Sequence, residues 1–321
     1  MNTIHICIAA DRNYKLPLMC LLESIYKNNR SKPCIVHVLY DNLSGHYRNK
    51  LVKKYKGTNI SLEFMNMSGL KFDFHGLDMQ HWTKAIFYRI MIPEIFTNLN
   101  RILYIDCDTL VLDDLFNLFN TDIPSDKNIA MVVDKYSWKT HMIKLNIKNY
   151  FNSGMILFNL QKCRKDKFTE KCIKWLYANT DKAVFPDQDA INTVCDGKIV
   201  RISNLYNKQF APNERIACDK HPVIIHFLSA VKPWMAKAPV SYSKLYRQYI
   251  PCKIQKYIIL ATQLIWQSKD FCFHKKHSMT LQHAKIVEQN KYYLFNICVF
   301  TKKLNNQQMN ITNIITKKNE Q

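Results

Sequence analysis

Short hydrophobic runs alternate with helical patterns along most of the chain, as far as about residue 230. The runs predict strands at Ile4–Ala10, Cys34–Tyr40, Ile60–Met65, Arg101–Asp106, Ile129–Val133, Gly154–Leu160 and Val223–Phe227. The intervening patterns predict helices at Leu16–Asn28, Ser44–Tyr55, Trp82–Phe96 and Arg164–Asn179. This alternation indicates an α/β fold with a mostly parallel sheet and helices on both faces. Because ligands of such sheets bind beyond the carboxyl ends of the strands, polar residues just after a strand are the candidates for function.

The character of the chain changes after Trp234. Residues 1–234 hold 32 Lys+Arg and 22 Asp+Glu, whereas residues 235–321 hold 14 and 3. We therefore expect a main domain over 1–234, a basic and mainly helical region over 235–304, and a disordered polar tail over 305–321. Within the basic region, Lys253–Trp266 combines apolar and cationic residues, as a helix on an anionic membrane does. The alternative is a helix packed on the main domain, with solvated lysines.

Composition narrows the class of protein further. The 321 residues are 47% hydrophobic, which excludes a wholly disordered chain, and the net charge is +21. That charge fits nucleic acid, an anionic membrane or a phosphate-bearing substrate. Without a recognisable nucleic-acid-reading module, we expect no nucleic-acid partner. Eleven cysteines without a CxxC pair, no signal-peptide pattern and no run of about 20 apolar residues predict a cytoplasmic, reducing environment.

Two carboxylates follow the clearest predicted strand. The stretch Tyr104–Leu112 reads YIDCDTLVL, so Asp106 and Asp108 are separated by one residue at the carboxyl end of the strand. Alternating strand geometry places both side chains on one side. Their hard oxygen atoms suit Mg²⁺ or Mn²⁺ and, through the metal, a diphosphate. Taken alone, the stretch is equally compatible with a strand followed by an ordinary polar loop.

The same stretch allows a second chemistry. A hydrophobic strand followed by Asp-x-Asp-x-Thr is also typical of haloacid-dehalogenase-type phosphatases, in which Asp106 would attack phosphorus and Asp108 would be the acid and base. That family usually carries the motif on its first core strand, whereas several strand–helix units precede it here. It also needs a later acidic pair on another strand, and we expect Asp187 and Asp189 to open a helix instead.

Three further clusters carry amides and carboxylates of the kind that hydrogen-bond a base, a ribose or sugar hydroxyls. Asp11 and Asn13 follow the first predicted strand, Asn152 precedes a later one, and Asp187 and Gln188 follow a proline. Each also has a plainer interpretation, such as a turn residue at Asn152 or a helix cap at Asp187. Their joint order along the chain is more specific than any one of them.

His226 and Lys232 complete the series after the last predicted strand. A histidine at that position could complete a metal shell, and a lysine six residues later could reach phosphate. A satisfied core histidine is the plainer interpretation of His226.

Together these motifs resemble glycosyltransferase family 8, the retaining, metal-dependent enzymes that include lipopolysaccharide core galactosyl- and glucosyltransferases. The resemblance runs from about Ile4 to Trp234. It implies the nucleotide-sugar-binding α/β fold called GT-A, with a mixed, mostly parallel sheet flanked by helices. It also implies that Asp106, Asp108 and His226 are the ligands of Mn²⁺ or Mg²⁺.

The resemblance assigns the remaining candidates to the donor and the acceptor. The positions that match donor-contacting residues are Asp11 and Asn13 for the uridine, Arg89 for the donor, Asn152, Asp187 and Gln188 for the donor sugar, and Lys232 for the diphosphate. Asp134 matches a carboxylate near the acceptor. Gln188, Asp187 and Asp134 are therefore the candidate catalytic residues. Neither Gln188 nor Asp187 is well suited as a nucleophile, which favours front-face attack over a covalent intermediate.

One position departs from the pattern of the family. After His226 the family usually has an aromatic residue, any residue and then glycine, whereas this chain has Ser229 in the place of the glycine. Glycine allows a backbone to approach phosphate closely. We expect Ser229 to remain at the donor site and to weaken donor binding without abolishing activity.

The resemblance leads to a functional expectation. The chain is expected to transfer galactose or glucose from a UDP-sugar to the core of a lipopolysaccharide or lipooligosaccharide. An anionic glycolipid acceptor and the basic C-terminal region predict a peripheral position on the inner face of a bacterial cytoplasmic membrane. The alternatives are a glycosyltransferase acting on another glycan or on protein, the phosphatase described above, and a non-catalytic carbohydrate-binding relative.

Overall fold

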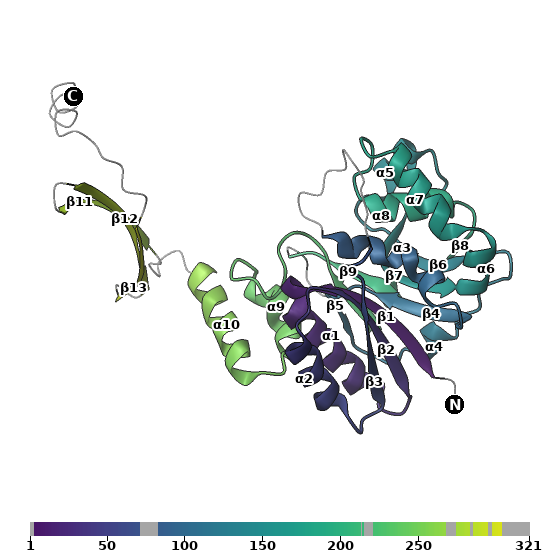
Figure 1. Cartoon of the computed structure of the whole chain (residues 1–321), viewed down its shortest axis with the longest axis horizontal. Coiled ribbons are helices and arrows are strands. Elements are labelled where there is room, and N and C mark those ends of the chain that lie inside the picture. Colours follow the sequence, from purple (N-terminus) through teal and green to yellow (C-terminus); the bar gives the residue numbers. More distant parts are fainter. Residues whose placement is uncertain are drawn as a thin grey trace.

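The computed structural model places a broad α/β body around a central sheet (Figure 1). It describes residues 3–70, 83–212, 214, 221–267, 274–282, 285–294 and 297–303. The predicted disordered tail at 305–321 lies outside these residues. Within the described part, no helix has the length and apolar character needed to cross a membrane.

A seven-stranded sheet forms the centre of the body, in the order β3-β2-β1-β4-β7-β6-β8. Its strands are β1 (Ile4–Asp11), β2 (Cys34–Asp41), β3 (Ile60–Asn66), β4 (Arg101–Ile105), β6 (Ile129–Val133), β7 (Phe151–Asn159) and β8 (Ile199–Arg201). The pairs from β3 to β4 are parallel, β7 is antiparallel to both β4 and β6, and β8 is parallel to β6. The sheet is therefore mixed and mostly parallel, and β1, β4, β6 and β8 end at the same edge.

Helices cover both faces of this sheet, as the alternating pattern predicts. On one face lie α1 (Lys15–Asn28) and α2 (Gly45–Tyr55), whose apolar residues pack on alternate positions of β1 and β2. On the other face lie α3 (Tyr88–Ile95), α6 (Leu160–Lys165), α7 (Phe168–Ala178) and α8 (Pro186–Val194). Short helices α4 (Phe116–Phe119) and α5 (Trp138–Leu145) and the 3-10 turns η1 (Arg12–Tyr14) and η2 (Lys84–Phe87) complete this part. The helix predicted over Trp82–Phe96 is η2 followed by α3.

A second, smaller sheet joins distant parts of the chain at the edge where β1, β4, β6 and β8 end. It consists of β5 (Thr109–Val111), β10 (Ile224–Phe227) and β9 (Lys208–Phe210), in the order β5-β10-β9, and the 3-10 turn η3 (Asn204–Asn207) precedes β9. A third apolar cluster links this sheet to α9 (Val240–Arg247) and α10 (Lys253–Gln267) through Phe227, Tyr242, Tyr246 and Ile259. Helix α10 is therefore packed on the main body.

The C-terminal region differs from the expectation of a mainly helical segment. Helices α9 and α10 extend to Gln267, but the strands β11 (His274–Gln282), β12 (Lys285–Leu294) and β13 (Ile297–Lys303) follow and form an antiparallel sheet. The stretch over β12 and β13 is rich in β-branched and aromatic residues, which favour strands over helices. Figure 1 shows this sheet beyond α10, apart from the central sheet.

Candidate active site

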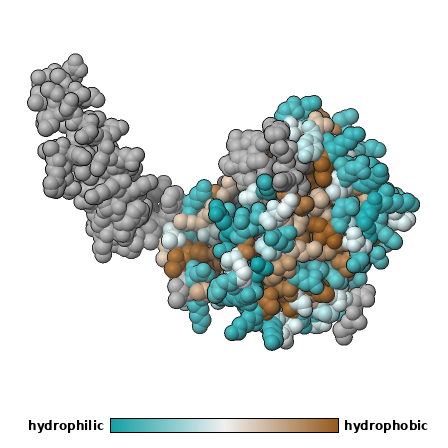
Figure 2. Space-filling view, viewed as in Figure 1, coloured by the Kyte–Doolittle hydropathy of each residue, from teal (hydrophilic) through white to brown (hydrophobic). Residues whose placement is uncertain are grey.

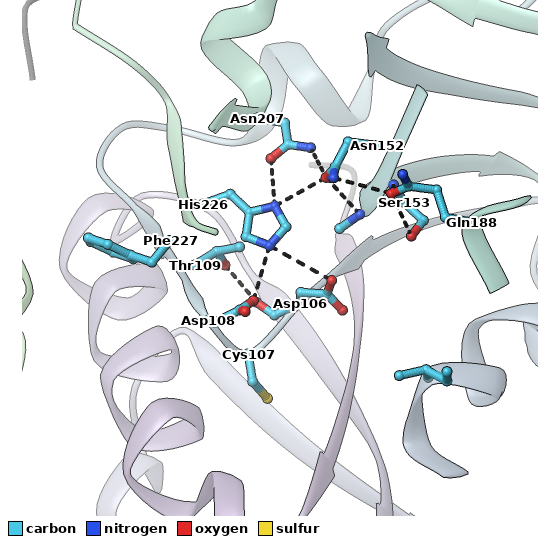
Figure 3. A network of polar contacts seen from close by, with 12 residues as sticks. Asp106, Cys107, Asp108, Thr109, Asn152, Ser153, Gln188, Asn207, His226 and Phe227 are labelled. Atoms are coloured by element: carbon cyan, nitrogen blue, oxygen red, sulfur yellow. Dashed lines mark hydrogen bonds and ion pairs between the residues drawn. The ribbon is translucent and has the colours of Figure 1, made fainter. Parts of the chain in front are cut away.

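Three potential metal ligands, here called the metal cluster, come from two distant segments. They meet at the edge of the central sheet where the parallel strands end. Asp106 and Asp108 lie in the connection between β4 and β5, and His226 lies in β10, where it pairs with Thr109 of β5. The Nε2 atom of His226 is 3.2 Å from Asp108 Oδ1 and 4.0 Å from Asp106 Oδ2 (Figure 3). One ligand atom from each of the three residues lies within 4.8 Å of the others.

The hydrogen bonds of His226 determine which of its two ring nitrogens could bind a cation. Its Nδ1 atom is 3.1 Å from Asn207 Oδ1 and 3.2 Å from Asn152 Oδ1, and both atoms are acceptors. Nδ1 therefore carries a proton, which leaves Nε2, the ring nitrogen that faces Asp106 and Asp108, as the one that could bind a cation. Two carboxylate oxygens and an imidazole nitrogen are a donor set that fits Mn²⁺ or Mg²⁺.

Close packing at Gly154 makes this convergence possible. A Cβ atom on Gly154 of β7 would lie 2.1 Å from His226 Cε1 and 3.0 Å from Asp106 Oδ2. Only glycine leaves room for the histidine and the carboxylate at this point. Gly154 was expected only as the first residue of a strand, because its importance comes from residues 48 and 72 positions away.

A buried arginine joins the metal cluster to the predicted sugar-binding residues. Arg89 of α3 donates to Asp106 through Nη2 at 2.7 Å and Nη1 at 3.3 Å, and its Nε lies 3.2 Å from Asp187 Oδ2. Burial opposes its charge, but Asp106 and Asp187 more than offset burial and raise its pKa. Ser153 adds a further link, because its hydroxyl accepts from Arg89 and donates to Asp187. Arg89 therefore holds the two carboxylates in fixed positions.

The two carboxylates at the metal cluster are each paired with a cation. The Tyr104 hydroxyl and Arg89 donate to Asp106, and the Lys232 ammonium donates to Asp108 Oδ2 at 2.7 Å. Burial opposes ionisation of Asp108, but Lys232 and His226 bring its pKa well below the usual range. Asp108 is therefore ionised and ready to bind a cation.

Amide and carboxylate side chains form a second network beside the metal cluster. Asn152 donates to Asp134 Oδ2 at 3.3 Å and to Gln188 Oε1 at 3.2 Å, and Gln188 donates to Asp134 at 3.4 Å. All three residues are buried. Burial raises the pKa of the neighbouring Asp187, and Arg89 only partly offsets this rise. The structure thus brings together residues that are up to 54 positions apart.

A buried cluster behind Gln188 fixes the start of α8. Asp189 accepts hydrogen bonds from the backbone N–H groups of Val184 and Phe185, from the Tyr150 hydroxyl, and lies 3.2 Å from His141 Nδ1. These contacts anchor the loop that presents Asp187 and Gln188. Asp187 and Asp189 open a helix, as the sequence predicts. Asn207 was not predicted, because an amide in a polar turn gives no signal of its own.

The remaining candidates lie at the ends of β1 and β10. Asp11 accepts a hydrogen bond from the Asn13 backbone N–H at 2.7 Å and so caps η1. Asn13 is exposed. Ser229 lies in the turn after β10 with φ at +79°, in the left-handed region that favours glycine. Within the described residues, none of these three makes a polar contact with the metal cluster, although the strand ends meet at one edge.

The geometry does not favour the phosphatase alternative. Asp106, the required nucleophile, follows the fourth strand of the chain and is held by Arg89 and Tyr104. Asp187 and Asp189 lie in the first turn of α8 rather than at the end of a strand. The second acidic pair of that mechanism is therefore not supplied by these residues.

Comparison with solved structures identifies the fold. The galactosyltransferase LgtC, in complex with donor and acceptor sugar analogs, is similar with a TM-score of 0.65 and 22% sequence identity. The similarity covers 77% of this chain and 95% of LgtC. The fold is therefore the GT-A fold, as the sequence resemblance implies.

Comparison of sequences gives the family. "General stress protein A" of Bacillus subtilis is 27% identical over 267 residues, which are 77% of this chain and 93% of that protein. "Lipopolysaccharide glucosyltransferase WaaO" of Escherichia coli K12 is 27% identical over 250 residues, or 72% of each chain. The model of glycosyl transferase family 8 matches residues 5–238, which include the metal cluster and the network of Asn152, Asp134 and Gln188 beside it. The chain belongs to glycosyltransferase family 8.

Proposed function

We propose that the chain is a metal-dependent retaining glycosyltransferase that transfers galactose or glucose from a UDP-sugar to a lipopolysaccharide or lipooligosaccharide core. The observation that carries the proposal is the convergence of Asp106, Asp108 and His226 beside Asn152 and Gln188. A nucleotide diphosphate-sugar needs a cation for its diphosphate and hydrogen-bonding groups for its sugar hydroxyls. The candidate metal site and the buried amide network beside it would supply both.

Departure of UDP needs positive charge at the diphosphate. A Mn²⁺ or Mg²⁺ ion held by Asp106, Asp108 and His226 would supply Lewis-acid stabilisation of that charge. Lys232 supplies a second cation, and its ammonium lies 2.7 Å from Asp108, at the metal cluster itself. Family resemblance assigns this lysine to the diphosphate. Asp11 and Asn13, at the end of β1, are proposed to hold the uridine.

The sugar-binding network is proposed to orient the donor hexose and the acceptor. Asn152, Asp187 and Gln188 would contact donor hydroxyls, with Arg89 holding Asp187 in place. Asp134 lies next to this group through its contacts with Asn152 and Gln188, which fits a position near the acceptor. The two oxygens of Asp134 are occupied, because Oδ1 accepts from backbone N–H groups and Oδ2 from the two amides.

These occupied carboxylates support front-face attack. A covalent route needs a free carboxylate oxygen below the sugar ring. Asp187 Oδ2 is engaged by Arg89 and Ser153, and Asp134 is engaged at both oxygens. We propose that the departing phosphate oxygen takes the acceptor proton as the new glycosidic bond forms. A glycosyl adduct trapped on Asp187 or Asp134 would contradict this mechanism.

The nature of the acceptor follows from the relatives and from charge. The Escherichia coli relative is named as a lipopolysaccharide glucosyltransferase. The strongly basic region after Trp234 fits an anionic, lipid-linked acceptor and an anionic membrane surface. We propose that the enzyme works as a peripheral protein on the inner face of a bacterial cytoplasmic membrane.

A donor panel tests the proposed activity. Purified protein is incubated with Mn²⁺ and, separately, UDP-galactose, UDP-glucose and other nucleotide-sugars, and UDP release is measured without an acceptor. We expect slow, metal-dependent release from one UDP-hexose above all others. No release from any donor would favour the carbohydrate-binding alternative. Release of inorganic phosphate from a simple phosphate ester, retained in Asp11→Ala and without UDP release from any donor, would favour phosphatase chemistry.

A further inference from the structure

A cavity of about 630 Å³ lies beside the sugar-binding network, and none of the residues assigned to the donor lines it. Its volume is within the range of about 300–1,000 Å³ that is usual for ligand pockets. The lining residues come from the carboxyl ends of β6 and β8 and from η3 and β9. The cavity therefore opens at the edge of the sheet where the metal cluster lies.

The charge of the lining is entirely positive. Lys135, Arg201 and Lys208 contribute cations, and no aspartate or glutamate is among the lining residues. Lys135 is paired with Glu214, at the margin of the cavity. Within the described part of the chain, Arg201 and Lys208 have no ion-pair partner. Two uncompensated cations in a hollow attract an anionic group, which could bind both.

The cavity shares residues with the catalytic edge. Asn207 lines it and also hydrogen-bonds Asn152 and lies 3.1 Å from His226 Nδ1. Lys135 directly follows Asp134, and its backbone N–H donates to the Gln209 side chain, which in turn donates to the Val133 carbonyl. A molecule in the cavity would therefore touch the same rigid framework that positions the proposed acceptor carboxylate.

We propose that this cavity binds a phosphate group on the acceptor, at a sugar next to the one that is glycosylated. The inference rests on the proposed transferase function, and it adds a site that binds an anionic group of the acceptor. Ser203 and Asn204 offer further hydrogen-bond donors, and Val132 and Ile202 give an apolar floor against which a sugar ring can lie. A phosphate, with more charge and three terminal oxygens, suits two separate cations better than a carboxylate does.

Ligand-observed NMR with three probes tests the site. Glucose 6-phosphate, glucuronate and glucose are titrated into the full-length protein with UDP and Mn²⁺ at saturating concentrations, so that the donor site is filled. The test variant is Arg201→Gln/Lys208→Gln. The matched control is Lys171→Gln/Lys174→Gln, which removes the same charge from two exposed lysines of α7.

We expect glucose 6-phosphate to bind most tightly and to lose about tenfold or more in affinity in the test variant, as expected for charge-assisted contacts. The control should bind it like wild type. Tighter binding of glucuronate, lost in the same variant, would keep the anion site and correct its ligand to a carboxylate. Equal binding by wild type and the test variant, or equal loss in the control, would overturn the inference.

The donor reaction separates this inference from the proposed function. UDP release from the preferred UDP-hexose should be the same in wild type and in both double variants, because Arg201 and Lys208 touch no donor residue. If wild type releases UDP but shows no anion preference, only the cavity assignment fails. If wild type releases no UDP, the proposed function itself fails.

Discussion

Gly154 illustrates how closely the residues of the active site are packed. Its missing Cβ makes room for the ring of His226 and for Asp106, which approach from β10 and from the end of β4. The glycine has an ordinary backbone conformation, since it is not among the residues with positive φ. Its role is therefore steric, and the effect of adding one methyl group is direct.

We predict that Gly154→Ala abolishes metal-dependent UDP release and lowers the free energy of unfolding by about 1–3 kcal/mol, because His226 must be displaced. UDP release and thermal unfolding are measured for this variant and for Gly45→Ala. The added Cβ at Gly45 meets only the end of Arg48 at 3.7 Å, so the control should behave like wild type. An active Gly154→Ala would show that His226 is not held as described.

Asn207 acts on the metal cluster through His226. Its side-chain oxygen accepts the Nδ1 proton, which leaves Nε2 free to bind a cation. We predict that Asn207→Ala weakens Mn²⁺ binding by about 10–100-fold, measured directly by electron paramagnetic resonance of the free ion. Asn204→Ala, on the same 3-10 turn but exposed, is the control. Unchanged Mn²⁺ affinity in Asn207→Ala would remove this positioning role.

Ser229 is a residue in a conformation that suits glycine. Its φ of +79° is expected to cost about 1 kcal/mol relative to glycine. We therefore predict that Ser229→Gly raises the melting temperature and lowers the Michaelis constant for the donor. Steady-state kinetics of UDP release checks the second effect. An unchanged or higher Michaelis constant would show that the serine does not hinder the donor.

The candidate residues could be predicted from the sequence where they belong to a local motif. They could not be predicted where their role depends on contact with residues far away in the sequence. Asp106, Asp108 and His226 each follow or lie within a readable strand, and the structure places them together. Asn207 lies in no such pattern, and the predicted strand that begins at Gly154 gives no reason for glycine there. Their importance depends on side chains from other strands, and one sequence without structure contains no measure of that proximity.

At the scale of elements, α10 presents two opposite faces. Ile259 and Gln263 are buried, and the Gln263 amide donates to the Pro233 carbonyl at 2.8 Å. On the other side, Tyr257, Ile258 and Leu264 are 53–67% exposed. Figure 2 shows hydrophobic residues at the surface where α10 lies. The two interpretations of this segment are therefore compatible, because the helix packs on the body and still offers an apolar face to a membrane.

We predict that the wild-type protein floats with vesicles that contain anionic lipid, and that Tyr257→Ser/Ile258→Ser/Leu264→Ser reduces flotation severalfold. A truncation after residue 250 would also remove the buried contacts of Gln263, so substitutions are the sharper test. Val52→Ser/Tyr177→Ser removes exposed hydrophobic residues from α2 and α7 and is the control. Equal flotation of all three proteins would contradict membrane attachment through α10.

Element prediction from the sequence succeeded best in the layered part of the fold. Apolar alternation located β1 and β2, and their parallel register runs from Ile4 opposite Cys34 to Asp11 opposite Asp41. Periodicity could not predict the three-residue strands β5, β8 and β9, because such strands are shorter than any repeat. The strands β11–β13 were not predicted, because the helical expectation for this region rested on the one segment Lys253–Trp266.

At the scale of the whole molecule, the active site is an assembly of remote segments. The connection after β4, the start of α8 and the strand β10 are separated by about 40 to 120 residues and meet at one sheet edge. The carboxylates there are balanced by Arg89 and Lys232, so the proposed metal and diphosphate would enter a site whose charge is already partly neutralised. The net charge of +21 supports the proposed position at an anionic membrane, while these few residues carry the proposed chemistry.

We propose that Asp106, Asp108 and His226 form one metal centre that drives the departure of UDP. The most direct test is a Mn²⁺ titration of UDP release by wild type and by Asp108→Asn, with Asp126→Asn, whose side chain is 70% exposed, as the control. We predict saturable Mn²⁺ dependence in wild type and in the control, and loss of at least about 100-fold in apparent metal affinity in Asp108→Asn. Metal-independent UDP release, or an unchanged Mn²⁺ titration in Asp108→Asn, would show that these three residues do not form the metal centre of the reaction.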